Sequence, residues 1–399
     1  MNWSWITFLF AGRFLSSAVF FMYVGTLPFI LSLWGLTATE AGIIQTGSVV
    51  GFGLALSIST YLSDFKNPSQ ILIFFSITNC LFAFLFALLA SDFISALILN
   101  FFLGLSQGGI YGPSMILVSE KYVPANRGKA MGLNIAGQSF GYGISLGLSF
   151  VLANLYSLQT AFLICSILTI LGLLIFLAGL WKDLSKKYHF KKSIFKFDKK
   201  DDNKKNLIVS YSAHSVELFG MWAWLPVFLS IILLDIAELS PVVIGLLVGV
   251  VLHFSGFIAN MIAGTLSDRL GRRFIMVLFA LSSGLISFLI GWIVDWNWMI
   301  ILIISILYSF FCIGDSSVLT ASLTENTSRS VLGRALAFRS IIGIGLASIT
   351  PAIFGYILDL SNNHQPIDTS TNWVYAFSFL GISGLIATYF AYKTKTKRI

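Results

Sequence analysis

Apolar residues along this chain gather into long runs that alternate with short polar segments. A helix needs about 20 mainly apolar residues to cross the hydrocarbon core of a bilayer. Runs of that length fall near 5–34, 40–62, 70–90, 94–117, 129–152 and 159–181, and again near 207–233, 240–265, 274–294, 298–322, 336–358 and 372–392. The pattern predicts an all-α membrane protein with twelve transmembrane helices in two six-helix bundles.

The division into domains follows from the charged gap between the two sets of runs. We expect an N-terminal bundle over 1–181, a cytoplasmic Lys-rich linker over 182–206 and a C-terminal bundle over 207–399. The linker holds ten lysines and four aspartates, which favours a solvated segment. Anionic headgroups would also attract it, at about 1 kcal/mol per basic residue near the membrane surface.

The charges between the runs predict the orientation. With a cytoplasmic N-terminus, the outer loops carry no Lys or Arg and hold only the acids Glu40, Asp92, Asp235, Glu238, Asp295, Asp359 and Asp368. The inner loops and the C-terminal tail hold every Lys and Arg except Arg13, with Arg339 just inside the eleventh run. An excess of basic residues on cytoplasmic loops is the positive-inside pattern. We therefore expect a multi-pass protein of the bacterial inner membrane with both termini in the cytoplasm.

Composition agrees with this prediction and excludes several classes of protein. Charged residues make up 11% of the chain, against about 25% in soluble domains, and apolar residues make up 57%. The net charge of +8 is confined to loops, so it indicates topology rather than nucleic-acid binding. No P-loop or nucleophile elbow is visible, and the loops are too short for a catalytic domain, so we expect no enzyme. The scattered histidines predict no metal site, and we expect no cofactor.

The two halves share an internal repeat. Glu120, Gly128 and Ala130 map onto Glu325, Gly333 and Ala335 at a constant offset of 205. A Leu-Pro pair also recurs in the first and seventh runs, at Pro28 and Pro226. Parallel halves of this kind are a transporter architecture, with the substrate site between the halves near mid-membrane.

A basic motif follows the eighth run and consists of Gly264, Asp268, Arg269, Gly271, Arg272 and Arg273. It resembles the inter-helix motif of the major facilitator superfamily, and with the six-plus-six layout the resemblance covers the whole chain. We expect Gly264 to permit close helix contact and Asp268 to accept hydrogen bonds from a neighbouring helix start. The alternative is that the arginines only anchor the topology.

The resemblance implies a conformational latch at the cytoplasmic ends of the helices. By pseudo-symmetry, Asp268 should meet the start of the fifth helix near Arg127 and Gly128. Asp64, in a first-half copy of the motif that has lost both glycines, should meet the start of the eleventh helix near Gly333 and Arg334. Removing Asp268 should break the latch and favour the inward-open state of the protein.

Two departures from the family pattern weigh against a proton-driven drug exporter. The drug-antiporter branch has an arginine in helix 4, where this chain has Asn100, and a Gly-Pro signature in helix 5, where the run from Gly137 to Gly143 has no proline. The seventh run, 214–226, resembles that of the cyanate-permease-like bacterial branch.

Five titratable residues lie inside the apolar runs: Arg13, His214, Glu217, His253 and Asp315. Burying a charge in a membrane costs about 2.5–3.5 kcal/mol on insertion scales, so such residues mark substrate or ion paths. We expect Arg13 to anchor an anionic group, and Glu217, on one helix face with His214, and Asp315 to bind protons.

Each of these residues also has a purely structural interpretation. Arg13 could extend to the inner headgroups, Glu217 could pair with His214 or Arg13, and Asp315 could cap a local helix break near Gly314. His253 could be a satisfied packing histidine. Helices 1, 7 and 10 line the central cavity in the family, which favours the functional interpretation for the set.

The sequence therefore predicts a monomeric secondary active transporter that works by alternating access. We expect proton-coupled uptake of a small, anionic organic solute. An exporter of a drug or siderophore is the alternative within the class. A non-transporting membrane sensor or scaffold is the alternative outside it, although such a protein would not need buried titratable residues.

Overall fold

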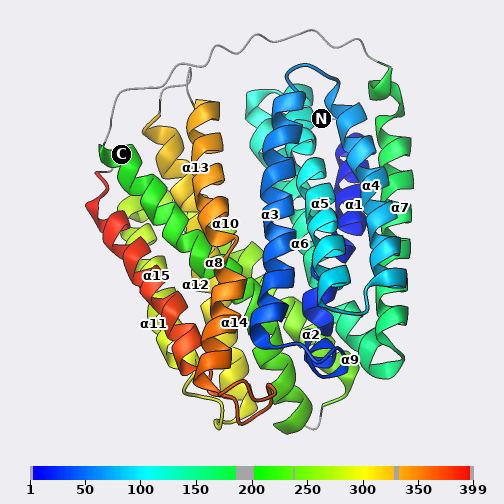
Figure 1. Cartoon of the computed structure of the whole chain (residues 1–399). Helices are drawn as coiled ribbons and strands as arrows, with labels where there is room; N and C mark the ends of the chain where they lie inside the picture. The colour runs from blue at the N-terminus through cyan, green and yellow to red at the C-terminus, as the bar shows by residue number, and fades with distance from the viewer. Residues whose placement is uncertain (1–2, 186–201, 237–238, 328–331, 396–399) are drawn as a thin grey trace. The chain divides into compact units, whose positions relative to one another are not determined.

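The computed structural model describes residues 3–185, 202–236, 239–327 and 332–395 (Figure 1). Within these ranges the regular elements are helices, and no strand occurs. The α-helices are α1 (Trp3–Ser16), α2 (Met22–Leu33), α3 (Ala38–Leu62), α4 (Pro68–Leu89), α5 (Phe93–Lys121), α6 (Pro124–Leu155), α7 (Leu158–Leu184), α8 (Asp202–Ile236), α9 (Pro241–Gly249), α10 (Ser255–Leu270), α11 (Arg272–Ile290), α12 (Trp298–Glu325), α13 (Leu332–Ala347), α14 (Thr350–Ser361) and α15 (Val374–Lys393). A short 3₁₀ turn, η1 (Ser17–Val19), and a π-helical turn, η2 (Val250–Phe254), complete the elements.

Eleven helical segments of the described chain are long and apolar enough to cross a membrane. They include Ser4–Leu33, which joins α1, η1 and α2, and Phe338–Ser361, which joins α13 and α14. The remaining predicted run, 240–265, is occupied by α9, η2 and α10 in direct succession. The predicted all-α membrane fold is confirmed, with three of its runs broken rather than continuous.

One of these breaks has a clear cause in the sequence. Pro351 stands in the first turn of α14, where a proline is tolerated because its missing N–H would have no partner. The same residue cannot continue α13, since its ring would clash with the carbonyl one turn earlier. The helix therefore restarts at Thr350.

By packing, the chain divides into two compact units. Unit 1 comprises Met1–Trp34, Gly47–Ile194 and Pro241–Gly249, and unit 2 comprises Gly35–Thr46, Phe195–Ser240 and Val250–Ile399. The predicted domains differ from these units in two short segments, Gly35–Thr46 and Pro241–Gly249. Most of the predicted linker, 186–201, lies outside the described residues.

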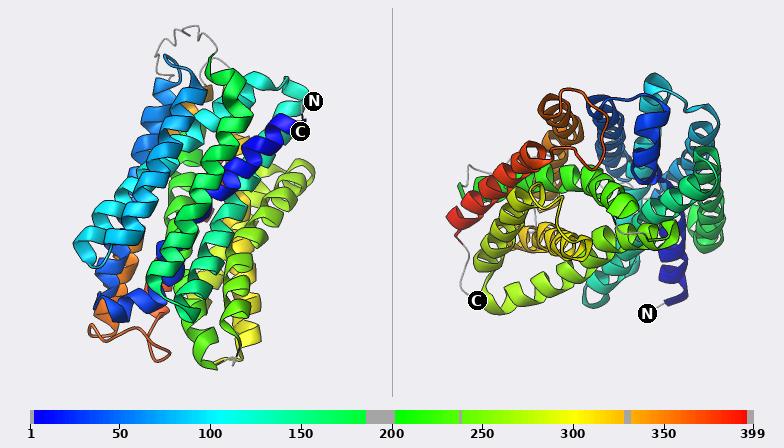
Figure 2. Two further views of the ribbon diagram at one scale, coloured as in Figure 1. Left: turned by 90° about the vertical axis from the view of Figure 1, so that its right-hand side faces the viewer. Right: turned by 90° about the horizontal axis from the view of Figure 1, so that it is seen from below.

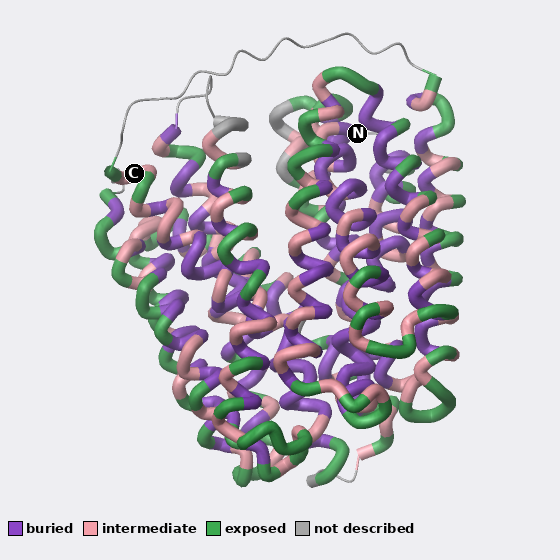
Figure 3. Tube along the Cα trace, in the orientation of Figure 1, coloured by how far each residue is buried: buried purple, intermediate pink, exposed green. Residues whose placement is uncertain are grey.

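Each unit has its own apolar core. The core of unit 1 is centred on residues such as Leu72, Ile110 and Phe176. In unit 2, α11 lies beside α15 and α12 (Figure 2). The core of unit 2 is centred on Ile275, Phe279 and Leu319. Large apolar side chains are also exposed, among them Phe74, Leu88 and Ile303. Exposed positions recur along the helices of both units (Figure 3). An apolar exterior over helices of this length is what a lipid environment requires.

Within unit 2, the carboxylate of Asp359 caps the start of α3. Its two oxygens accept hydrogen bonds from the backbone N–H of Ala38 (3.0 Å) and Thr39 (2.8 Å), and Thr39 Oγ1 donates a further one at 2.5 Å. Gly42 and Gly355 allow this contact, because a Cβ on either would collide with the backbone of the opposite helix. The sequence placed Asp359 in an outer loop, whereas it is a buried residue of α14.

We expect Asp359→Ala to speed amide hydrogen exchange at Ala38 and Thr39. Losing a capping carboxylate costs about 1 kcal/mol, which corresponds to roughly fivefold faster local opening. Exchange mass spectrometry of peptides from the start of α3 measures the change. Unaltered exchange in these peptides would contradict the capping role.

Asp92→Ala is the matched control for this measurement. Asp92 caps α5 by accepting a hydrogen bond from the Ser95 N–H at 3.0 Å. That backbone bond lowers the pKa of Asp92, so its cap is fully formed at neutral pH and is lost only as the pH falls through this lowered value. The control should speed exchange at the start of α5 and leave the start of α3 unchanged.

Candidate functional site

Arg13 lies in the last turn of α1, buried within unit 1. Its side chain is 1% exposed, so it does not extend to the headgroups. Nη2 donates a hydrogen bond to Gln138 Oε1, and the guanidinium lies over the ring of Tyr111 at 5.3 Å from the centroid. A neutral amide and an aromatic face offset part of the desolvation of the cation without neutralising its charge.

The partner of Arg13 belongs to a polar stripe along α6. Asn134, Gln138 and Tyr142 follow one another at intervals of four residues, so they share one helix face. Gln138 Nε2 donates to the Tyr142 hydroxyl at 2.5 Å, and Asn134 Nδ2 donates to Ser114 Oγ at 3.0 Å. The stripe fixes the amide that holds Arg13.

Several polar atoms of this cluster remain without a hydrogen-bond partner within the described chain. They are Nε and Nη1 of Arg13 and Oδ1 of Asn134. A buried donor left unsatisfied costs about 1–3 kcal/mol, more when it is charged. Such atoms are rare in native proteins, and each one indicates a ligand, a water or a functional role. Arg13 therefore has free donor capacity for an anion.

Two further amides hold the break in the first helix. Asn79 Nδ2 (3.0 Å) and Gln107 Nε2 (2.5 Å) both donate to the Ser16 carbonyl, which the break at η1 leaves without its helical partner. Gln107 also donates to Asn79 Oδ1 at 3.0 Å. The sequence prediction missed these residues, although uncharged amides inside apolar runs are a usable signal.

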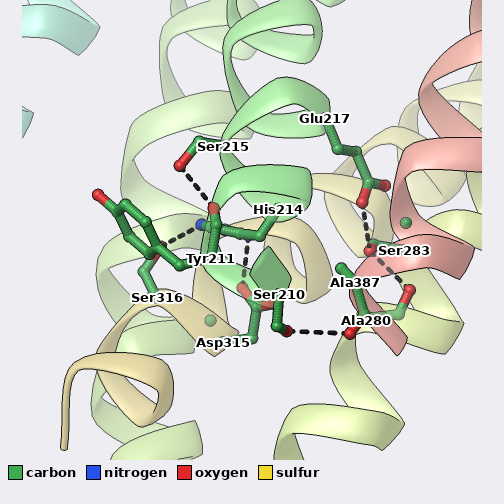
Figure 4. Close-up of polar contacts among 12 residues, drawn as sticks. Ser210, Tyr211, His214, Ser215, Glu217, Ala280, Ser283, Asp315, Ser316 and Ala387 are labelled. Atoms are coloured by element: carbon green, nitrogen blue, oxygen red, sulfur yellow. Dashed lines mark hydrogen bonds and ion pairs between the residues drawn. The ribbon is translucent and has the colours of Figure 1, made fainter. Parts of the chain in front are cut away.

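Unit 2 contains a second polar cluster, centred on His214 (Figure 4). His214 Nδ1 lies 2.8 Å from Asp315 Oδ1, and His214 Nε2 lies 2.7 Å from Ser316 Oγ. His214 and Asp315 are both buried. Because the two ring nitrogens contact different groups, a change of tautomer or charge on the imidazole alters both contacts at once.

Glu217 lies one turn beyond His214 on α8 but contacts a different helix. Ser283 of α11 donates to Glu217 Oε2 at 3.1 Å, while Oε1 has no hydrogen-bond partner among the described residues. The two residues thus point to different neighbours, and His214 pairs with Asp315. The suggestion that Asp315 caps a helix break is wrong, since α12 is continuous through it.

Arg339 is a buried cation that the sequence prediction did not include in the site. Its Nη1 donates to Thr320 Oγ1 at 2.8 Å, and its guanidinium lies 4.0 Å from the centroid of Tyr211. Tyr211 in turn lies beside His214, with 6.0 Å between the ring centroids. The offset of 205 between the halves maps Arg339 onto Asn134, another buried polar residue that the sequence prediction did not name.

His253 lies in the π-helical turn η2 and is buried, with its ring centroid 5.9 Å from that of Trp222. Over the described residues, no group of His, Cys, Asp and Glu has the arrangement of a metal site. π-helical turns recur at functional sites, so His253 stays a candidate for the substrate path.

The basic motif forms the turn between α10 and α11. Gly271 adopts φ = 94°, a conformation that side chains disfavour. Arg272 contacts Asp268 at 2.6 Å and Glu325 at 2.8 Å, and Arg273 lies 4.2 Å from the ring centroid of Tyr392. Arg269 is exposed. The motif is thus tied to the end of α12 and to α15.

Close packing at Gly264 is the part of the motif prediction that is wrong. A Cβ there would have only Ser317 Oγ within 4 Å, at 3.9 Å, so the position does not require glycine.

Arg127 Nε donates to the Tyr122 carbonyl at 3.3 Å. The side chain of Arg334 lies outside the described residues. The latch contacts of Asp64 and Asp268 join the two units, which are described separately, and they stay a prediction.

The apolar helical spans of the described residues define a multi-pass membrane protein. A family model described as the Major Facilitator Superfamily matches residues 9–235 and 211–398. The chain therefore belongs to the Major Facilitator Superfamily and is a transporter rather than an enzyme.

Two relatives with assigned substrates resemble the chain over most of its length. A probable 4-methylmuconolactone transporter of Cupriavidus pinatubonensis is 24% identical over 85% of this chain and 82% of its own length. A cis,cis-muconate transport protein of Acinetobacter baylyi is 23% identical over 88% of this chain and 87% of its own length. An uncharacterized transporter of Buchnera aphidicola is 23% identical over 42% of this chain and 41% of its own length.

We expect Asp268→Asn to shift the protein toward its inward-open state. A carboxylate at a helix N-terminus is worth about 0.3–1 kcal/mol, so the ratio of the two states should change roughly two- to fivefold. Spin labels at the end of α5, near Lys121, and at the end of α12, near Glu325, report the distance distribution. Asp202→Asn, which removes an exposed carboxylate at the start of α8, is the control. An unchanged distribution in Asp268→Asn would rule the latch out.

Proposed function

We propose that this transporter carries a small organic anion into the cell together with a proton, by alternating access across the bacterial inner membrane. The observation that carries the proposal is that two nitrogens of the buried Arg13, Nε and Nη1, have no hydrogen-bond partner among the described residues. A guanidinium remains charged at physiological pH and presents its N–H groups in a fork that fits a carboxylate. A carboxylate substrate would both satisfy these donors and offset the buried charge.

The aromatic surroundings of Arg13 support a planar, unsaturated acid as the substrate. Tyr111 lies beside Phe52 at 6.1 Å, Phe52 beside Phe20 at 5.6 Å, and Phe20 is stacked on Tyr142 at 4.8 Å, all between ring centroids. Flat conjugated groups pack favourably against such faces. The muconate and muconolactone named for the two relatives are unsaturated and carry carboxylates, which agrees with this class.

Unit 2 supplies the groups for proton coupling. Glu217 and Asp315 are buried carboxyl groups, and low dielectric makes an isolated negative charge expensive. Each carboxyl contacts a polar group whose interaction changes when the carboxyl gains a proton. This group is Ser283 for Glu217 and His214 for Asp315. Binding a proton at either carboxyl would lower the cost of carrying the loaded site across the membrane.

Uptake of radiolabelled cis,cis-muconate and benzoate into proteoliposomes tests this function. Glu217→Gln and Asp315→Asn should lose accumulation driven by an inward proton gradient and keep counterflow exchange, because exchange needs no net proton movement. Asp235→Asn, an exposed carboxylate near the end of α8, is the control and should accumulate normally. Accumulation against a gradient in both acid variants would exclude these carboxyls as the coupling groups.

Arg13 variants test the anion anchor separately from the coupling. Arg13→Gln keeps hydrogen-bonding capacity but removes the charge, so substrate binding should fall by about 1.5–3 kcal/mol, or roughly ten- to a hundredfold. Arg13→Lys keeps the charge without the fork and should be intermediate. Isothermal titration calorimetry with the same acids gives the dissociation constants. Equal affinity in wild type and Arg13→Gln would show that the carboxylate binds elsewhere.

The proposed orientation places both termini and the loops with Lys66, Arg127, Arg272 and Arg334 in the cytoplasm. Single cysteines introduced at Lys66 and Lys192 should be protected in intact cells from a membrane-impermeant maleimide, and should react after permeabilisation. A cysteine at Asp92 is the control and should react in intact cells. Labelling of the Lys66 or Lys192 cysteine in intact cells would reverse the orientation.

A further inference from the structure

A cavity of about 520 Å³ lies in unit 1, between the start of α1 and the end of α7. Its lining residues are Ser4, Trp5, Phe8, Lys121, Leu177, Ala178, Gly179, Trp181, Lys182 and Asp183. None of the polar residues around Arg13 contributes to it. The cavity is therefore separate from the proposed anion site at Arg13, and a different ligand is needed to account for it.

The polar part of the cavity is built around Asp183. Trp5 Nε1 donates to Asp183 Oδ2 at 3.0 Å, and Lys121 Nζ lies 3.4 Å from the same oxygen. The Lys121 ammonium also lies 4.5 Å from the ring centroid of Trp5. Because Lys121 balances the charge of Asp183, the exposed Lys182 leaves the cavity with one net positive charge.

The rest of the cavity is apolar and lies at the surface of the unit. Trp181 is 71% exposed and Phe8 is 42% exposed, and each lies within a helical segment long enough to span a membrane. Tryptophan at the end of a membrane span is typical of the level of the lipid headgroups.

We propose that this cavity binds one anionic phospholipid. The phosphate lies against Lys182 and Lys121, and an acyl chain follows the apolar surface between α1 and α7. Basic pockets between transmembrane helices on the cytoplasmic side suit anionic headgroups. A free phosphate would make no use of the apolar side chains Trp181 and Phe8, so the apolar half of the cavity favours the whole lipid.

Native mass spectrometry of the purified protein tests the proposal with phosphatidylglycerol and phosphatidylcholine as probes. Wild type should retain one phosphatidylglycerol in clear preference to phosphatidylcholine. The double variant Lys121→Gln, Lys182→Gln should lose that preference by about tenfold, since each basic residue contributes to binding of anionic lipid. Lys393→Gln is the control, because Lys393 ends α15 over the ring of Tyr389 and does not line the cavity.

Three outcomes would overturn the proposal. Equal retention of the two lipids by wild type would remove the charge requirement, and unaltered preference in the double variant would place the lipid elsewhere. Displacement of phosphatidylglycerol by an equal concentration of glycerol 3-phosphate would show that the headgroup alone binds.

A second measurement covers the case in which the double variant fails to fold. Phosphatidylglycerol carrying a diazirine on its acyl chain should cross-link in wild type to peptides from α1 and α7. Cross-links confined to other helices would exclude this cavity. Neither measurement depends on transport, so the lipid site can fail while the proposed function stands.

Discussion

The low dielectric of the hydrocarbon core governs how the charged residues of this chain are placed. Water is not available there to solvate an ion, so each buried charge has to find its polar contacts within the protein. Arg13 finds them in Gln138 and Tyr111, Arg339 in Thr320 and Tyr211, and Asp315 in His214. These partners come from different helices, so satisfying the charges also fixes which helices pack together.

The transmembrane fold could be predicted from the sequence because lipid imposes one strong requirement, about 20 apolar residues for each span. The breaks within the spans could not, because hydropathy averages over a window and does not register where a backbone bond is lost. Only the break before α14 has a local cause that the sequence displays, the proline at Pro351, and the predicted run 336–358 continued through it. The break at η1 depends on two side chains distant in sequence, Asn79 and Gln107, which only the folded chain brings to the Ser16 carbonyl.

In the candidate site, the sequence predicted which residues are buried but not which neighbours they contact. The rarity of charge in apolar runs indicated Arg13, His214, Glu217 and Asp315, and the structure places all four as buried residues. Helical periodicity put His214 and Glu217 on one face, yet residues three apart on a helix can still reach different neighbours. Gly264 shows the opposite error, because a glycine in a family motif need not be one that the packing of this chain requires.

Asp359 ties the first turns of α3 to α14, and α3 then continues as one helix into the segment assigned to unit 1 at Gly47. Any rearrangement that frees the start of α3 from unit 2 must break three hydrogen bonds to one carboxylate, each worth about 1 kcal/mol or somewhat more. That sum is comparable to the few kcal/mol that separate alternative conformations of a protein. Asp359 can thus set the turnover number of the transporter while leaving its affinity for substrate unchanged.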